Sequence, residues 1–591
     1  MKNVWGKTAL ALSLVMSTAS VPVASVWADA AEQADPSDQA AAANAPVYRQ
    51  LTDALSVQVK GVLNEKTAAG VNIGVVVNLK NNTSETKRIP DYELRVKTSD
   101  GTVYTLLGSS ANAHSALPMS ETELSYMIKL DNKDAVALSE LQWIDVDWDV
   151  YPKTETAVLT VPADGLSWAG SDAVITDPAA IKNWGQTFTI PSSNLPLTYT
   201  PVDMDKQNNE QKTAYVVKLL VQNTGSSTIT VPDLVLEGKD GTSSFQGKQV
   251  EKDKVTIEPS EKKYVHYAIE TNQDTVLKTI NVLTPESFVQ TDAKGQSAAY
   301  DYTIGRVQIV LPEGRIPSSL QPVNYSYNDV IALDPVNKSV NSDVDISLVE
   351  LSMHENQGIG YKTAVAKFKL TNKSDTPLPV PAFGTELDTP QGVSYAGSRQ
   401  INPPKQLMPK LSHIVTYSFT VPNTEEGDQM MLKLSDTQAA APYKSAIAAL
   451  NVTMQPLAQA DDVLSFYPFQ VKVENWSIQA YTNLISAANP TLTYGYKLKM
   501  NVDVKQTDNV VVDQDFSKMK VALVDSAGRT LSEENLSFTD SAGIDKLVSG
   551  EVIVDFNKVR ADYQDNNLTI QVYESIQTEF GEAKRLVAVF K

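Results

Sequence analysis

The most regular feature of the chain is an alternation of apolar and polar residues over short stretches, which is typical of β-strands with one buried face. In residues 72–80, apolar side chains occupy every second position, and the same period of two runs through 364–371 and 494–505. Residues 215–221 are apolar on both faces, as in a more covered strand. Only 439–449 is a candidate helix, and it is short. The pattern predicts an all-β chain with little helix.

A spaced set of Asn, Pro and Tyr residues recurs three times. Each Asn precedes a proline by nine positions, a second proline follows 27 or 28 residues later, and a tyrosine stands eight residues beyond it. Parity places each tyrosine on the face of its apolar neighbours, so we expect buried tyrosines in corresponding strands, each after a proline that starts the strand. The three sets are Asn81, Pro90, Pro118 and Tyr126; Asn223, Pro232, Pro259 and Tyr267; and Asn372, Pro381, Pro409 and Tyr417.

This repeat divides the chain into about four units. The last unit keeps the alternation but lacks the Asn–Pro and Pro–Tyr spacings, so its core should be closed differently. One core per about 110–130 residues predicts tandem antiparallel immunoglobulin-like β-sandwiches, whereas a single β-solenoid would need much shorter repeats. The expected divisions are a signal peptide (1–30), a flexible spacer (31–46), sandwich 1 (47–162), a connector (163–185), sandwich 2 (186–312), a connector (313–343), sandwich 3 (344–456) and a divergent sandwich 4 (457–591).

The first 30 residues have the three parts of a secretory signal peptide. Lys2 and Lys7 are followed by a short apolar stretch, 9–16, and Ala28-Asp29-Ala30 is a small-x-small cleavage site before Ala31. A retained membrane anchor is the alternative, but the apolar run falls well short of the roughly 20 residues that a span needs. We therefore predict a secreted, extracellular protein, free or associated with the cell wall, with no membrane span after cleavage.

Composition narrows the chemistry. With 50 Lys and Arg against 70 Asp and Glu, the net charge is −20, which argues against a nucleic-acid partner. The chain has no Cys, which excludes disulfides, thiol catalysis and thiolate metal sites. Among four His, His354 begins a metalloprotease-like His-Glu run, but Gly358 stands where the second zinc ligand belongs, so we expect a polar turn there. His266 and His413 fall on opposite strand faces and are not equivalent ligands. We predict no enzyme activity and no cofactor.

The most suggestive acidic cluster is Asp145, Asp147 and Asp149. It has the 1-3-5 spacing of a calcium loop, but Val150 stands where the loop needs Gly, and Thr156 stands where it needs a bidentate Glu. Apolar residues alternate with the three acids. The run is therefore best interpreted as a strand with one acidic, solvated face, and weak Ca²⁺ binding is the alternative.

Several short motifs carry a family resemblance. They are Leu79-Lys80-Asn81, Asp100-Gly101 and Leu117-Pro118 in the first repeat, and Asp240-Gly241 and Pro259 in the second. With these motifs the chain resembles a family of immunoglobulin-like extracellular domains of unassigned function, found in secreted proteins and lipoproteins of Gram-positive bacteria. The chain departs from that family in lacking a lipid-anchored Cys and the glycine usual after the late proline, where it has Met119, Ser260 and Lys410. The resemblance implies a fold and a compartment, not an activity.

Two functional hypotheses follow. The first is an exported, non-enzymatic scaffold, spacer or protein-binding and adhesion module, because repeated sandwiches without a shared polar constellation present ligands on loops or edges. The second is a carbohydrate-binding accessory protein acting on cell-wall or extracellular polysaccharide. The second needs a platform of exposed aromatic rings, for which the pairs Tyr300/Tyr302 and Tyr325/Tyr327 are candidates, although packing within strands is the commoner arrangement. The expected partner is an exported protein or a cell-wall glycan.

Overall fold

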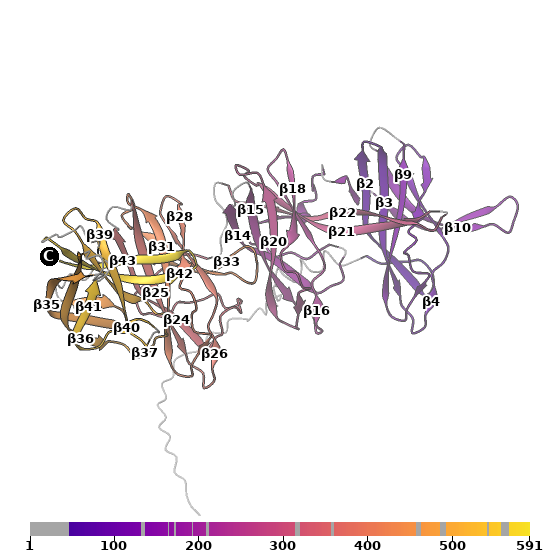
Figure 1. The fold of residues 1–591 in the computed structure, drawn as a ribbon. Helices are drawn as coiled ribbons and strands as arrows, with labels where there is room; N and C mark the ends of the chain where they lie inside the picture. Colours follow the sequence, from indigo (N-terminus) through magenta and orange to yellow (C-terminus); the bar gives the residue numbers. More distant parts are fainter. Residues whose placement is uncertain are drawn as a thin grey trace, which may run out of the picture. The chain divides into compact units, whose positions relative to one another are not determined.

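The computed structural model describes residues 47–591 apart from 132–135, 164, 171–172, 192, 209–211, 293, 314–319, 356–359, 457–462, 485–491, 541–542, 557–558 and 560–566. The predicted signal peptide and spacer, 1–46, lie outside the described residues. The all-β prediction is confirmed: apart from one 3-10 turn, Pro178–Ala180, the regular elements of the described residues are strands (Figure 1). No helix in this part of the chain has the length and apolarity needed to cross a membrane.

Sandwich 1 shows the plan of two packed sheets joined by a small ribbon. Its first sheet contains β2 (Leu55–Thr67), β3 (Gly70–Asn81) and β9 (Glu121–Leu130), with β1 (Arg49–Gln50), β7 (Leu107–Gly108) and β12 (Ser167–Trp168) at its edges. Its second sheet contains β5 (Glu93–Thr98), β6 (Val103–Thr105), β10 (Leu138–Asp147) and β11 (Thr154–Pro162). The ribbon pairs β4 (Lys87–Arg88) with β8 (Ser115–Ala116).

Sandwich 2 repeats this plan. The first layer is β14 (Leu197–Asn208), β15 (Thr213–Asn223) and β20 (Lys262–Thr271), and the second is β17 (Val235–Lys239), β21 (Thr279–Thr291), β22 (Ser297–Val310) and β13 (Ile181–Asn183). Here β18 (Ser244–Gln249) pairs with both β17 and β20, so the two layers form one continuous sheet. The ribbon is β16 (Ile229–Thr230) with β19 (Thr256–Ile257).

Sandwich 3 has the same plan. The first sheet is β24 (Val344–Glu355), β25 (Tyr361–Asn372), β31 (Ser412–Pro422) and β29 (Ser398–Arg399). The second is β23 (Val323–Asn324), β33 (Ser445–Val452), β32 (Met430–Asp436), β27 (Phe383–Asp388) and β28 (Ser394–Ala396), and the ribbon is β26 (Leu378–Pro379) with β30 (Gln406–Leu407). The candidate helix at 439–449 is not helical, because its second half forms β33 and pairs along β32. Sheet pairing outweighs the helix preference of its alanines.

The repeated Asn closes the same corner in sandwiches 1, 2 and 3. Asn81, Asn223 and Asn372 are fully buried. Each donates from Nδ2 to the carbonyl four residues on, and to a carbonyl of the ribbon, that of Ala116, Ile257 or Leu407. Each Oδ1 accepts the backbone N–H two residues on. The Asn therefore ties the end of the second strand to both its turn and its ribbon.

The repeated tyrosines occupy one register. Tyr126, Tyr267 and Tyr417 pair with β3, β15 and β25 at the position six residues before the repeated Asn. Tyr267 and Tyr417 are fully buried, as predicted, whereas Tyr126 is only partly buried against its core.

The prolines do not start the strands. Each is followed by a residue with positive φ, which is 49° at Met119, 63° at Ser260 and 59° at Lys410, and the strand begins two residues later. The proline thus opens a tight turn whose next position favours glycine, and this corrects the expectation of a strand-initial proline.

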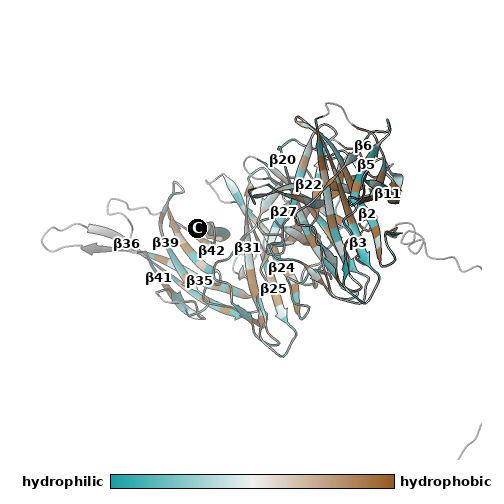
Figure 2. Ribbon diagram, turned by 90° about the vertical axis from the view of Figure 1, so that its right-hand side faces the viewer, coloured by the Kyte–Doolittle hydropathy of each residue, from teal (hydrophilic) through white to brown (hydrophobic). Residues whose placement is uncertain are grey.

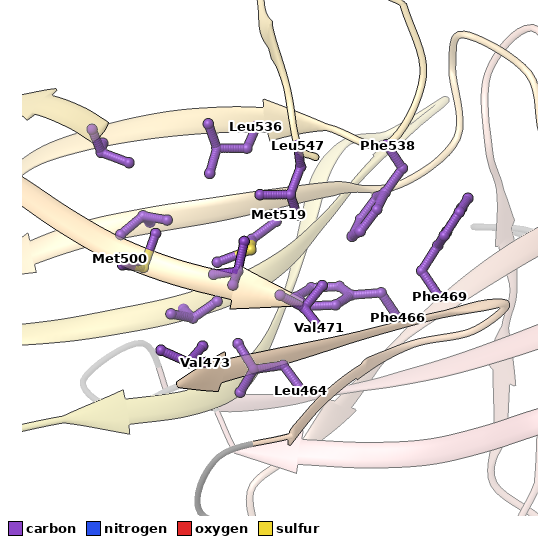
Figure 3. Close-up of a cluster of buried hydrophobic side chains, with 14 of the residues drawn as sticks. Leu464, Phe466, Phe469, Val471, Val473, Met500, Met519, Leu536, Phe538 and Leu547 are labelled. Carbon is purple, nitrogen blue, oxygen red and sulfur yellow. The ribbon is translucent and has the colours of Figure 1, made fainter. Parts of the chain in front are cut away.

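Sandwich 4 is built differently inside. One sheet is β34 (Val463–Phe466), β35 (Phe469–Leu484), β36 (Leu492–Gln506) and β41 (Gly550–Phe556), and the other is β40 (Asp545–Lys546), β39 (Thr530–Ser537), β38 (Lys518–Val524), β42 (Thr569–Thr578) and β43 (Gly581–Phe590). Hydrophobic and hydrophilic residues alternate along β35 and β41 (Figure 2). Phenylalanines fill the core, with the Phe469 ring stacked on Phe538 at 4.7 Å (Figure 3). The short β37 (Val510–Val511) pairs with β31 of sandwich 3.

The two segments expected to be connectors contain ordered elements. Segment 163–185 contains β12 and β13, and its Trp168 is buried. Segment 313–343 contains β23 and the buried Ile331, which belongs to the core of sandwich 3.

Candidate interaction site

The last two long strands of every sandwich form a hairpin that we call the closing hairpin: β10–β11, β21–β22, β32–β33 and β42–β43. All four hairpins have a β-bulge at a corresponding place: the second strand has one extra residue, opposite the step that follows Trp143, Val282, Leu434 and Val572 of the first strand. A bulge bends a strand and increases its twist. In sandwiches 2, 3 and 4, the hairpin beyond the bulge contacts the outer face of the first sheet of the preceding sandwich, which we call the receiving face.

Junction 1 joins β21–β22 to the receiving face of sandwich 1 and is mainly apolar. Leu63, Val76 and Met127 of sandwich 1 form one buried cluster with Leu283, Phe288, Tyr302 and Ile304 of the hairpin and with Trp168. Beside it, Glu286 accepts from Lys60 Nζ at 3.0 Å and from Arg306 Nη2 at 3.3 Å. Burial raises the pKa of Glu286, and the two cations oppose that rise. Glu286 of the hairpin thus forms an ion pair with Lys60 of sandwich 1 across the junction.

Junction 2 joins the start of β33 to the receiving face of sandwich 2 through polar contacts. Lys218 Nζ donates to the carbonyl of Ala446 at 3.0 Å, and Gln207 Nε2 donates to the carbonyl of Lys444 at 2.7 Å. His266 Nε2 lies 3.1 Å from Ser445 Oγ, and its Nδ1 lies 2.8 Å from Glu251 Oε1.

The Ser445, His266 and Glu251 side chains have the spacing of a serine–histidine–acid relay. However, Ser445 and His266 are both buried inside the junction. The adjacent hollow of about 430 Å³ is lined by Glu251 but not by Ser445 or His266. The hydroxyl is therefore enclosed between the two sandwiches, and the arrangement holds sandwich 3 on sandwich 2.

Junction 3 contains a closed ring of alternating charges. Sandwich 3 supplies Glu350 and Lys367, and sandwich 4 supplies Glu574 and Arg585. Lys367 Nζ lies 2.7 Å from Glu574 and 3.1 Å from Glu350, and Arg585 lies 2.6 Å from Glu574 and 2.8 Å from Glu350. All four residues are buried. Burial alone would raise the pKa of Glu574, but the charges of Arg585 and Lys367 hold it at about 2.

A polar cavity of about 380 Å³ borders this ring. Glu350, His354, Tyr467 and Arg585 are among its lining residues. His354 lies in β24 and is buried, so the expected polar turn is wrong: sandwich 4 covers the face of the strand that parity left exposed. Burial and the nearby Arg585 lower the pKa of His354 to about 3, which keeps the imidazole neutral. Glu350 and Arg585 neutralise each other, so the cavity offers no free charge from this pair.

The closing hairpin of sandwich 1 differs from the other three, because within the described residues it lies on no receiving face. Trp148 is 67 % exposed, Val150 is 43 % exposed and Tyr151 is wholly exposed. The hairpin extends beyond its own sandwich (the strand labelled β10 in Figure 1). Lys153 Nζ lies 4.7 Å from the centre of the Trp148 ring, within the range of a cation–π contact. An apolar aromatic group of this kind on a protruding hairpin is a candidate interaction site.

The predicted acidic cluster belongs to this hairpin. Asp145 and Asp147 are exposed on one face of β10, and Asp149 lies in the tip, where its backbone N–H donates to Asp147 Oδ1 at 2.9 Å. Counted from the bulge, Asp145 corresponds to Glu574 and Asp147 to Glu286. In the described part of the chain, no three acidic or imidazole side chains are grouped as metal ligands. Weak calcium binding at this cluster stays a prediction.

The tyrosine pairs are engaged within the molecule. Tyr302 is buried in junction 1, and the Tyr300 hydroxyl donates to Glu65 at 3.0 Å. The Tyr327 hydroxyl donates to the carbonyl of Thr453 at 2.6 Å, and both Tyr325 and Tyr327 pack on the core of sandwich 3.

His266, His354 and Tyr302 were considered from the sequence, but no residue was predicted to join two sandwiches. Lys218 and Lys367 both stand five residues before a repeated Asn, which is a position shared across the repeats. A lysine at this shared position in two repeats was the feature of the sequence from which a covered outer face could have been predicted.

Comparison with known proteins adds no relative. No family model matches the chain, and no curated protein sequence matches it. The exo-chitosanase CsxA of Amycolatopsis orientalis aligns over 88% of this chain and 92% of its own, with 6% identity and a TM-score of 0.11. A second structure of CsxA, described as an exo-beta-D-glucosaminidase with inhibitors, aligns over the same shares with 7% identity and a TM-score of 0.11. At that score neither the fold nor the activity of CsxA carries over.

Proposed function

We propose that this protein is an exported, non-enzymatic scaffold whose stacked sandwiches present the β10–β11 hairpin as a binding element. The observation that carries the proposal is the contrast among the closing hairpins. Those of sandwiches 2, 3 and 4 contact a receiving face, whereas the hairpin of sandwich 1 holds Trp148, Val150 and Tyr151 in solvent. Trp and Tyr are the residue types that most often carry the energy of protein–protein contacts.

Export is supported by the signal-peptide features of residues 1–30 and by the resemblance to immunoglobulin-like extracellular domains. A scaffold role without catalysis is supported by the state of the polar clusters. The Ser445–His266–Glu251 relay is enclosed, and the ring at junction 3 is neutralised by its own members. These groups are used to fix one sandwich on the next.

Carbohydrate binding is the alternative, and it rests on the same hairpin. The four tyrosines that were candidates for a sugar platform are engaged in packing or hydrogen bonds, while Trp148 and Tyr151 are exposed aromatic side chains. Such rings can stack on a sugar as well as pack into a protein pocket.

The test compares residues 31–591 with the variant Trp148→Ser/Tyr151→Ser in two binding assays, one on insoluble cell-wall glycan and one on the exported proteins of the source organism. Phe580→Ser is the matched control, because Phe580 is an exposed aromatic residue at the turn of another closing hairpin. We expect the double variant to lose binding by about tenfold or more and the control to keep it. Binding to the glycan alone would favour the carbohydrate alternative, and undiminished binding by the double variant would refute the role of the hairpin.

A further inference from the structure

Sandwich 4 carries a receiving face with no hairpin of the described chain on it. The central strand β36 turns Leu498 and Met500 into the core and Lys497, Lys499 and Asn501 outward. Beside them on β41, Ile553 is 46 % exposed. The other three receiving faces are each covered by a closing hairpin.

This face has the construction of the other three. Its β35–β36 pair has a bulge after Val473, at the place where the corresponding pairs have bulges after Val59, Pro201 and Leu348. Counted from that bulge, Asn501 occupies the position of Lys218 and Lys367, the lysines that contact a hairpin in junctions 2 and 3. A shared bulge gives the four sheets the same local twist, which is the shape that a closing hairpin meets.

Both uncovered elements carry charged residues at or beside the positions that form ion pairs in the other junctions. In junctions 1 and 3 the hairpin contributes an acid, Glu286 or Glu574, that pairs with a lysine of the receiving face. The β10–β11 hairpin has Asp145 and Asp147 at these two positions. The face of sandwich 4 has Lys497 and Lys499 along its central strand, with Glu551 and Asp555 on β41 at its side and Glu474 as its bulge residue. Lys497 Nζ lies 3.7 Å from Asp555, and Lys499 is the lysine nearest to Asn501 on this face.

We propose that the β10–β11 hairpin of one molecule docks on the β35–β36–β41 face of a second copy, which repeats between molecules the junction that the chain makes three times within itself. This inference rests on the proposed function, in which that hairpin is the binding element. Because each molecule offers one hairpin and one different face, the contact is heterologous and propagates head to tail. In the register of the other junctions Asp145 would lie beside Asn501, with Lys499 next to it on the outer face of β36, and Trp148 and Tyr151 would lie toward Ile553.

The experiment is sedimentation velocity on residues 31–591 over a wide range of concentration. We expect the wild-type chain to form species larger than a dimer. Both Trp148→Ser/Tyr151→Ser and Lys497→Glu/Lys499→Glu should remain monomeric at concentrations about tenfold higher or more. The control Lys248→Glu/Lys262→Glu, which reverses two exposed lysines of sandwich 2, should assemble as the wild type does.

Mixing the variants tests the geometry. An equimolar mixture of the hairpin variant and the face variant contains one intact hairpin and one intact face that can meet, so it should stop at a heterodimer. Asp145→Lys/Asp147→Lys mixed with Lys497→Glu/Lys499→Glu should recover association that neither variant shows alone.

A wild-type chain that stays monomeric, or assembly that the face variant leaves unchanged, would overturn this inference. If in that case the hairpin variant still loses binding to an exported protein or to glycan, the proposed function stands with that partner in place of a second copy. If the hairpin variant binds both glycan and exported proteins as the wild type does, the proposed function fails as well.

Discussion

Replacing Lys367 with methionine tests whether the buried ring of charges holds sandwich 4 on sandwich 3. Methionine keeps most of the apolar stem but removes contacts of Nζ with Glu574 at 2.7 Å, with Glu350 at 3.1 Å and with the carbonyl of Tyr467 at 3.3 Å. Two carboxylates then face one guanidinium in a site where Lys367 was wholly buried. Removing one partner from a buried ion pair costs about 3–5 kcal/mol, because the remaining charge is left uncompensated. We expect a loss of that size in the opening free energy of β42–β43 at pH 7.

The measurement is amide hydrogen exchange of β42 and β43 peptides in the full mature chain, followed as a function of urea, because local opening energies are read directly from protection. Lys369→Met is the matched control. Lys369 lies two residues further along β25, is partly exposed and pairs with Asp508 at 2.6 Å. A pair of this kind contributes less than about 1 kcal/mol.

The dependence on pH provides a second, independent check. The pKa of Glu574 is held at about 2, below the 4.5 of an unperturbed Glu, so its contribution to stability is complete above about pH 4.5 and is lost as the pH falls toward 2. In the Lys367→Met chain one carboxylate should retain its proton to higher pH. The difference in the opening free energy of β42–β43 between variant and wild type should therefore become smaller as the pH falls from 7 to 4. The reasoning would be refuted if Lys367→Met lowered the opening free energy no more than Lys369→Met does, or if the difference from wild type did not change with pH.

Three further substitutions test the repeated corner and core by urea unfolding of the mature chain. Asn223→Ala should cost about 1–3 kcal/mol, because the buried carbonyl of Ile257 loses its donor. The exposed Asn272→Ala should change the free energy of unfolding by no more than about 0.5 kcal/mol, and equal effects would show that Asn223 does not close the corner. Lys410→Gly should stabilise by about 1 kcal/mol, because Lys410 has positive φ, while Lys262→Gly within β20 should destabilise; destabilisation by both would contradict the turn. Tyr267→Ala should cost about 3–5 kcal/mol and Tyr126→Ala clearly less, since only Tyr267 is fully buried; the reverse order would mean that burial does not set the cost.

The features that the sequence predicted well are those set by residues close together along the chain. Alternation identified the strands because the direction of a side chain is determined by parity alone. The spacing of Asn81, Asn223 and Asn372 to the later tyrosines corresponds to one strand register in three sandwiches. The repeated second prolines were predicted to start strands, but they lie in the turns before them. A proline is compatible both with the first residue of a strand and with a turn.

Contacts between sandwiches could not be predicted from the same pattern. Parity places Lys367 and His354 on an outward face, but it does not say whether water or another sandwich covers that face. Asp145 and Asp147 were identified as a cluster, yet their correspondence to Glu574 and Glu286 became visible only when four hairpins could be aligned on their bulges. Candidate sites of this kind depend on tertiary pairing, which has no period along the chain.

The different chemistry of the junctions has a consequence for folding. Neighbouring sandwiches of similar build risk pairing wrongly while a chain folds, which is a characteristic failure of repeat proteins. If β42–β43 met the receiving face of sandwich 1, Glu574 and Arg585 would be buried against Val76, where junction 3 has Lys367. If β21–β22 met sandwich 3, Phe288 and Ile304 would cover the Lys367–Glu350 pair and replace its contacts with Glu574 and Arg585. Each wrong pairing buries an ion pair that has lost half of its partners in the ring, so the ring favours the β42–β43 hairpin on sandwich 3 over the other hairpins.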